Sequence, residues 1–220
     1  MVGRALAAAL AIGATATAAQ AYERAQTEHG VALRWTRGEL AWSVGGSEID
    51  LALVQRAASA WTDAGCPGLK LRPARRGEHA DITLALAAGP WPHARDEAAW
   101  TTVRADPDSG RAWRADIAIH ARWWSDTSVD RGALLVHEFG HALGLGHTID
   151  RQTVMFGGLG RRTSLASDDR NGVCAVFAAA ATAAQPRPKR WPSLAGLPLL
   201  AWIAFSAGLP RRRGRGARPR

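Results

Sequence analysis

The chain has no acidic residue beyond position 186, and this absence decides how its charge is interpreted. Residues 187–220 hold eight arginines and Lys189, so residues 1–186 carry 28 − 9 = 19 basic groups against all 19 acidic groups. The net charge of +9 therefore belongs to the end of the chain, and the body is electrically neutral. Because a neutral body offers no basic stripe to phosphates, the charge pattern excludes a nucleic-acid-binding face.

The composition also lacks the bias of a disordered or fibrous chain, and the sequence contains no internal repeat. Hydrophobic residues make up 47% and charged residues 21% of the 220 positions, which is close to the globular average. The sequence therefore predicts one folded domain of ordinary size with extra segments at its ends.

The first 21 residues have the pattern of a secretory signal peptide. A short basic start is followed by apolar or small uncharged residues over 5–18, and Ala19-Gln20-Ala21 fits the small-x-small rule for cleavage. We expect a signal peptide at 1–21 and a mature chain that begins at Tyr22. The alternative is an alanine-rich first helix, but the charged residues from Glu23 onward favour cleavage.

The other end of the chain has the layout of a surface anchor. Residues 178–192 are rich in Ala and Pro, as in a linker, so the folded domain is expected to span 22–177. An uncharged hydrophobic segment at 193–210 then precedes an arginine-rich end at 211–220, which indicates an anchor with its basic end in the cytoplasm. The segment is of marginal length for a bilayer.

This layout resembles the C-terminal sorting tails of bacterial surface proteins, so a retained membrane anchor and a processed sorting signal both remain open. A buried C-terminal helix is a third alternative, but it leaves the arginine cluster unexplained. We expect the protein to be secreted across the membrane and associated with the surface.

Cysteine is scarce, with Cys66 and Cys174 as its two occurrences, 108 positions apart. Export to an oxidising compartment favours a disulfide between them, and closing so long a loop would contribute roughly 3 to 5 kcal/mol. The alternative is a pair of buried thiols.

Short apolar or alternating runs predict strands, and apolar residues at helical spacing predict helices. The expected strands are 39–44, 69–71, 81–87, 100–105 and 115–120. The expected helices cover 49–63, with Ser47 near its start, and 129–145, with a last helix after Ser167 or Asp168. Strands that precede helices in this order point to an α+β domain.

The segment from His137 to His147 reads HEFGHALGLGH and contains the candidate metal ligands and the candidate catalytic residue. His137 and His141 lie four residues apart, so a helix directs both imidazoles at one ion. Gly144 permits a left-handed turn that brings His147 in as the third ligand. Three neutral imidazoles leave a position for water, as in a catalytic zinc site, and Glu138 would act as the general base on the zinc-bound water.

A methionine, Met155, follows eight residues after His147. The full histidine pattern with a downstream Met resembles the metzincin metalloproteases. Thr148, directly after His147, makes the chain look most like the matrixins, over roughly residues 35–177. Astacins have a tyrosine ligand after the Met, whereas the one tyrosine of this chain is Tyr22.

The resemblance implies a twisted mixed sheet, an active-site helix and a C-terminal helix. It also implies that Met155 packs beneath the three imidazoles and that residues from Phe156 onward line the pocket for the substrate side chain beyond the cut bond. Asp168 and Asp169 would be supports of the last helix.

One catalytic Zn²⁺ is the expected cofactor. His79, His93 and His120 lack the spacing of the second, structural zinc site of animal matrixins. The acidic segment 106–110 is more often a turn than a calcium loop. The sequence thus supports no structural Zn²⁺ or Ca²⁺.

Together these patterns predict an exported, monomeric zinc metalloendopeptidase with protein or peptide substrates, tethered to a membrane by its C-terminal segment. Residues 100–104 are the candidate edge strand for pairing with an extended peptide. The alternative function is a non-catalytic, zinc-containing surface binding protein. Glu138 argues against it, because a structural zinc needs no base.

Overall fold

The computed structural model describes residues 22–87, 89–158 and 160–184. The expected signal peptide, hydrophobic segment and arginine-rich end lie outside these residues, as does most of the expected linker. None of the helices in this described part of the chain combines the length and the hydropathy needed to cross a bilayer.

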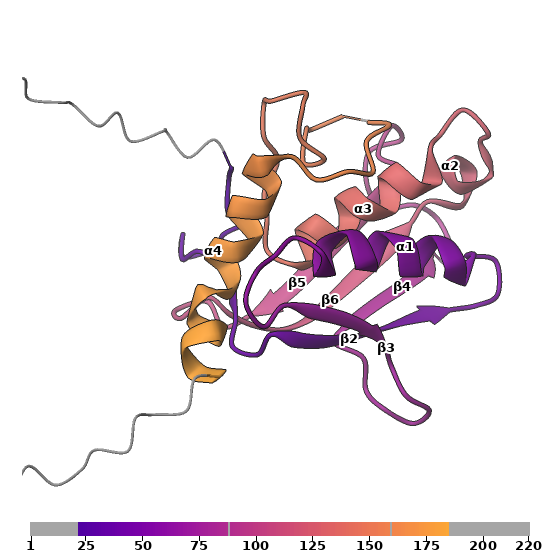
Figure 1. Cartoon of the computed structure of the whole chain (residues 1–220). Coiled ribbons are helices and arrows are strands. Elements are labelled where there is room, and N and C mark those ends of the chain that lie inside the picture. Colours follow the sequence, from indigo (N-terminus) through magenta and orange to yellow (C-terminus); the bar gives the residue numbers. More distant parts are fainter. Residues whose placement is uncertain (1–21, 88, 159, 185–220) are drawn as a thin grey trace, which may run out of the picture. The chain divides into compact units, whose positions relative to one another are not determined.

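A mixed six-stranded sheet forms the centre of the domain (Figure 1). Its spatial order is β1-β6-β4-β2-β3, and β5 pairs with β6. The β5–β6 pair is antiparallel and the other pairs are parallel. The bounds of the strands are β1 Arg34–Trp35, β2 Glu39–Gly45, β3 Lys70–Pro73, β4 Ile82–Leu86, β5 Ala99–Ala105 and β6 Arg111–Ile119. The predicted mixed sheet with helices is therefore confirmed, and each predicted strand overlaps an observed one.

Two helices, α1 (Leu51–Thr62) and α3 (Arg131–Ala142), lie side by side on one face of the sheet (Figure 1). The apolar residues of α1 fall on one side at helical spacing and are buried, with Trp61 fully so. The carboxylate of Asp50 caps this helix by accepting a hydrogen bond from the Ala52 amide (2.8 Å). The cap is thus Asp50 and not Ser47, since Asp50 directly precedes the first helical residue.

Helix α3 is shorter at both ends than the predicted range 129–145. Asp130 caps its start by accepting from the Ala133 amide (3.0 Å). At its end Gly144 has φ +104°, and the amides of Gly144 and Leu145 bond back to the carbonyls of His141 and Gly140. This is the Schellman arrangement, in which a glycine after the helix adopts a conformation unfavourable for other residues.

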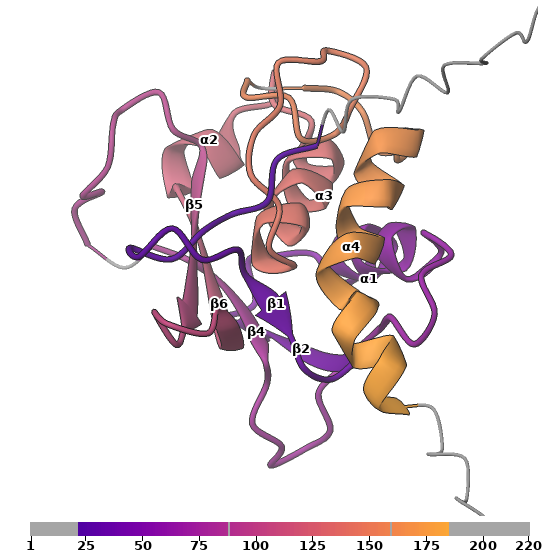
Figure 2. The same cartoon turned by 90° about the vertical axis from the view of Figure 1, so that its left-hand side faces the viewer.

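The last helix, α4, covers Ser167–Ala184 and lies beside β1 (Figure 2). It continues past Phe177, where the domain was expected to end, into the stretch predicted to be a linker. The difference has a simple cause, because residues 178–184 are almost all alanine, the strongest helix former.

The predicted disulfide between Cys66 and Cys174 is present, with the two Cα atoms 4.9 Å apart. It ties the loop after α1 to α4. Two elements were not predicted: β1, and the five-residue helix α2 (Ala121–Ser125), which His120 caps by accepting from the Arg122 amide (3.1 Å). Both are too short to show a hydrophobic period.

Candidate metal centre

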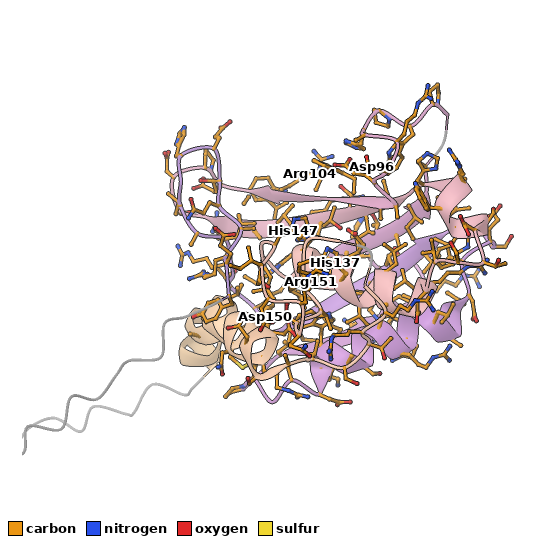
Figure 3. The ribbon with its side chains drawn as sticks, turned by 90° about the horizontal axis from the view of Figure 1, so that it is seen from above. Asp96, Arg104, His137, His147, Asp150 and Arg151 are labelled. Atoms are coloured by element: carbon orange, nitrogen blue, oxygen red, sulfur yellow. A yellow bond between two sulfur atoms is a disulfide. The ribbon has the colours of Figure 1, made fainter. Side chains whose placement is uncertain are left out.

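Three imidazoles converge on one point at the end of α3. His137 and His141 project from consecutive turns of the helix, and the turn at Gly144 brings His147 against them. Their Nε2 atoms lie 3.0 to 3.2 Å from one another. Figure 3 shows His137 and His147 near each other, in the middle of the domain. Among the described residues, these three form the one group of three or more His, Cys, Asp or Glu side chains that could hold a metal ion.

The other ring nitrogens show that two of the three converging atoms, those of His137 and His141, carry lone pairs. His137 Nδ1 donates to the carbonyl of Val154 (2.7 Å), and His141 Nδ1 donates to the carbonyl of Leu145 (2.8 Å). A neutral imidazole that donates through Nδ1 has an unprotonated Nε2. Lone pairs aimed at one another repel unless a cation lies between them, and their spacing suits Zn–N bonds of about 2.0 to 2.1 Å. The residues present therefore fit a zinc ion.

Burial keeps the two imidazoles of α3 uncharged. It lowers the pKa of His137 to about 4, with the neighbouring imidazoles His141 and His147 adding to the effect. Burial also lowers the pKa of His141 to about 4. At neutral pH both rings are therefore neutral, which is the form that binds a metal.

A carboxylate of α4 holds the backbone segment whose carbonyl orients His137. Asp169, 1% exposed, accepts hydrogen bonds from the amides of Val154 (3.1 Å), Met155 (3.4 Å) and Ala166 (2.8 Å). Burial raises the pKa of Asp169, and these amides counteract the rise. Asp169 thus supports the segment of Met155 and, through the peptide group that joins Val154 to Met155, the orientation of His137.

Met155 is buried, and its sulfur lies against Gly140 on α3. A Cβ atom at Gly140 would overlap the sulfur of Met155 and come within 2.8 Å of the Trp61 ring. The absence of a side chain at Gly140 therefore lets the methionine pack directly under the helix that carries the first two imidazoles.

The carbonyl that orients His141 is held by the start of the described chain. Arg24 and Leu145 form an antiparallel bridge, with bonds from the Ala25 amide to the Gly144 carbonyl (2.9 Å) and from the Gly146 amide to the Glu23 carbonyl (2.8 Å). Residues 23–25 therefore fix the strip of backbone that connects the second imidazole with the third.

Glu138 lies beside the imidazoles and is 5% exposed. Its Oε2 accepts a hydrogen bond from the hydroxyl of Thr101 on β5 (2.6 Å). Burial raises the pKa of the Glu138 carboxyl above its ordinary value, although His137 and Thr101 oppose the rise. The site thus places a buried carboxyl of raised pKa next to three converging imidazole nitrogens, a combination suited to moving a proton.

A cavity of about 1070 Å³ opens over the imidazoles, between β5 and residues from 151–158 and 160–162. Thr101 and Val103 lie on one side of it, and Phe156 and Arg162 on the other. Val129 and Leu134 at the start of α3 also line it. Its size suits several side chains of an extended peptide better than a single small molecule.

The remaining histidines named in the sequence analysis lie elsewhere. The His93 ring stacks on Trp100 with ring centroids 4.2 Å apart, and His120 caps α2. In the 106–110 segment, Asp106 accepts from the amide and hydroxyl of Ser109 (2.7 and 2.6 Å), which is a turn arrangement.

The fold and the site define a zinc-metallopeptidase type of domain: a mixed sheet, a helix that presents two imidazoles and a carboxylate, a glycine turn to a third imidazole, and a methionine packed against that helix. The chain belongs to the matrixin family, whose family model matches residues 34–178. None of the curated proteins compared with the chain matches it.

Sequence reasoning missed three parts of this site: Thr101, the carbonyls that orient the imidazoles, and residues 23–25. Side chains of a strand point alternately to its two faces, so the predicted strand 100–105 already placed Thr101 and Val103 on one face. In the structure positions 99, 101 and 103 are indeed less exposed than Trp100, Thr102 and Arg104. No sequence signal marks the backbone acceptors.

Proposed function

We propose that this protein is an exported zinc endopeptidase that hydrolyses protein or peptide substrates with Glu138 as general base. The observation that carries the proposal is the buried Glu138 carboxyl beside three converging imidazoles, two of which have an unprotonated Nε2, on the lining of an open cavity. A site that only held a structural ion would use a fourth protein ligand and would need neither the cavity nor the base.

His137, His141 and His147 would hold the zinc ion, which when bound acidifies water and polarises a carbonyl as a Lewis acid. Glu138 accepts a proton from the attacking water while the water oxygen bonds to the peptide carbonyl carbon. The carboxyl then gives this proton to the departing amine nitrogen as the C–N bond breaks. The raised pKa of Glu138 suits both steps, since the group must take up a proton and release it again.

The substrate would bind along β5 by strand addition. Within the described chain β5 pairs with β6 and with no other strand, so one edge of β5 has free backbone donors and acceptors beside the cavity. A proline scan of residues 100–104 tests this: each proline removes one backbone donor, and turnover that stays unchanged throughout would refute the binding mode.

The substrate side chain beyond the cut bond would enter the part of the cavity lined by Leu134, Val154 and Phe156. These residues are mainly apolar, which favours an apolar side chain at that position. Cleavage-site mapping with a peptide library checks this preference directly.

Export and surface attachment complete the proposal. Disulfides such as Cys66–Cys174 form and persist in oxidising compartments outside the cytoplasm, which supports export. The sequence of residues 193–220 supports attachment by the C-terminal end. N-terminal sequencing of protein recovered from the cell surface should begin at Tyr22, and recovery from the cytoplasm with residues 1–21 intact would refute export.

The decisive experiment is hydrolysis of a quenched mixed peptide library by the full chain, with zinc quantified in the same sample. The matched control is Glu138→Gln, which keeps the shape of the side chain and removes the base. Cleavage that follows zinc content and is lost in the variant supports the proposal. A zinc-loaded protein that cuts nothing would favour the non-catalytic binding protein, and a folded protein without zinc would overturn the metal site.

A further inference from the structure

We propose that Thr101 is a positioning residue that orients the Glu138 carboxylate toward the imidazole site. The inference rests on the proposed function, and it adds a residue that the histidine motif does not contain. Its basis is the 2.6 Å hydrogen bond from the Thr101 hydroxyl to Oε2 of Glu138.

The contact is strong for its kind. A hydroxyl that donates to a carboxylate at 2.5 to 2.7 Å is a charge-assisted hydrogen bond, roughly twice as strong as a neutral one. Glu138 is 5% exposed, so little water competes for Oε2. Among the described residues, Thr101 provides the one side-chain hydrogen bond to this carboxylate.

Orientation matters because a glutamate side chain is flexible. Its freely rotating bonds allow several rotamers, and a general base must lie within hydrogen-bond reach of the proton that it takes. The bond to Thr101 engages Oε2 and thereby sets the direction of Oε1, the oxygen available for proton transfer. Loss of this bond would leave the base in place but let it sample unproductive orientations.

Threonine at position 101 is well suited to this role. A β-branched side chain on a strand has few accessible χ1 rotamers, so its hydroxyl has a defined direction. Position 101 lies on the less exposed face of β5, and β5 is held in register by its antiparallel pairing with β6. Strand β5, which is proposed to bind the peptide, thus also orients Glu138, the base that acts on that peptide.

The test compares three variants of the full chain. Thr101→Val removes the hydroxyl at nearly constant volume, and Thr101→Ser restores it. Thr83→Val is the matched control, because Thr83 also donates to a carboxylate at 2.6 Å, that of Asp116, from strand β4 on the sheet and outside the cavity. Zinc content, kcat and KM are measured for each variant on one peptide.

We expect Thr101→Val to keep its zinc and a KM within about twofold, while kcat falls about 10- to 100-fold, as for a misplaced catalytic group. Thr101→Ser should recover most of kcat, and Thr83→Val should leave both constants unchanged. A Thr101→Val variant with unchanged kcat would overturn the inference, and so would a serine variant as impaired as the valine variant. Loss of zinc in Thr101→Val would point to a merely structural role.

A second measurement needs no activity. In the metal-free protein, Thr101→Val should lower the melting temperature by about 5 °C, because it leaves a buried carboxylate unsatisfied. In a Glu138→Ala background the same substitution should have almost no effect. Equal shifts in both backgrounds would refute the hydrogen bond itself.

The two experiments separate the possible failures. If the unsubstituted protein binds zinc and cuts nothing, the proposed function fails, and the catalytic role of Thr101 fails with it even if the melting temperatures show the bond. If the unsubstituted protein is active and Thr101→Val is equally active, the inference about Thr101 alone is wrong.

Discussion

Asp169→Ala should weaken zinc binding although Asp169 does not touch the metal centre. The variant removes the acceptor of three buried amides, those of Val154, Met155 and Ala166. An unsatisfied buried group costs about 1 to 3 kcal/mol. Because one of the three bonds is long, at 3.4 Å, we expect a total loss of about 3 to 4 kcal/mol of unfolding free energy.

The effect on zinc follows from the peptide group that joins Val154 to Met155. Its N–H, that of Met155, bonds to Asp169, and its carbonyl, that of Val154, accepts from His137 Nδ1, so a shift of this peptide group misorients the imidazole. Loss of such an outer partner typically costs 10- to 100-fold in metal affinity. The assays are urea unfolding of the metal-free protein and competition with a chelator of known zinc affinity.

Asp106→Ala is the control for this prediction. Asp106 also accepts from a backbone amide, that of Ser109 (2.7 Å), but in a turn that does not line the cavity. It should lower stability by less than Asp169→Ala does and leave zinc affinity unchanged. If Asp169→Ala bound zinc as tightly as the unsubstituted protein, the argument that α4 orients His137 through Val154 would be refuted.

Three further predictions concern packing, the disulfide and pH. Gly140→Ala should cost about 1 to 3 kcal/mol of unfolding free energy, since its Cβ overlaps the sulfur of Met155; a denaturant midpoint equal to that of the unsubstituted protein would contradict this. Replacing Cys66 and Cys174 by serine should cost about 3 to 5 kcal/mol, because the bond closes a loop of 108 positions; the same unfolding assay checks it, and a loss below about 1 kcal/mol would count against it. The metal-free protein should lose stability as the pH falls from 6.5 toward 4: burial lowers the pKa of the two α3 imidazoles from 6.5 to about 4, so the unfolded chain takes up protons that the folded one does not. Each imidazole should lower the free energy of unfolding by about 2 kcal/mol between pH 7 and pH 5. Equal unfolding midpoints at these two pH values would refute the claim that both imidazoles are buried in their neutral form.

The metal ligands could be predicted because their arrangement is local. His137 and His141 are one helical turn apart, and Gly144 adopts the positive φ at which the chain turns back toward His147. Periodicity likewise located α1, α3 and the strands. The first residue of α1 was harder to predict, since Ser47 and Asp50 are both residue types that cap helices well. In the structure the cap is Asp50, directly before Leu51.

The remaining parts of the site depend on contacts between distant segments. Thr101 meets Glu138 because β5 lies across α3, and no spacing in the sequence encodes that crossing. The carbonyls of Val154 and Leu145 act through the backbone, so any residue type could occupy those positions. The end of α4 was missed because an alanine-rich composition fits both a linker and a helix.

The pairing of residues 23–25 with 144–146 also bears on the order in which the domain folds. Helices form early from local contacts, whereas pairing between segments so far apart in sequence must first overcome the entropy of closing a long loop. During synthesis, residues 23–25 stay without this partner until Leu145 has been made. The carbonyl that orients His141 is therefore fixed only after this long-range pairing has formed, and the chain should acquire high metal affinity no earlier than that step.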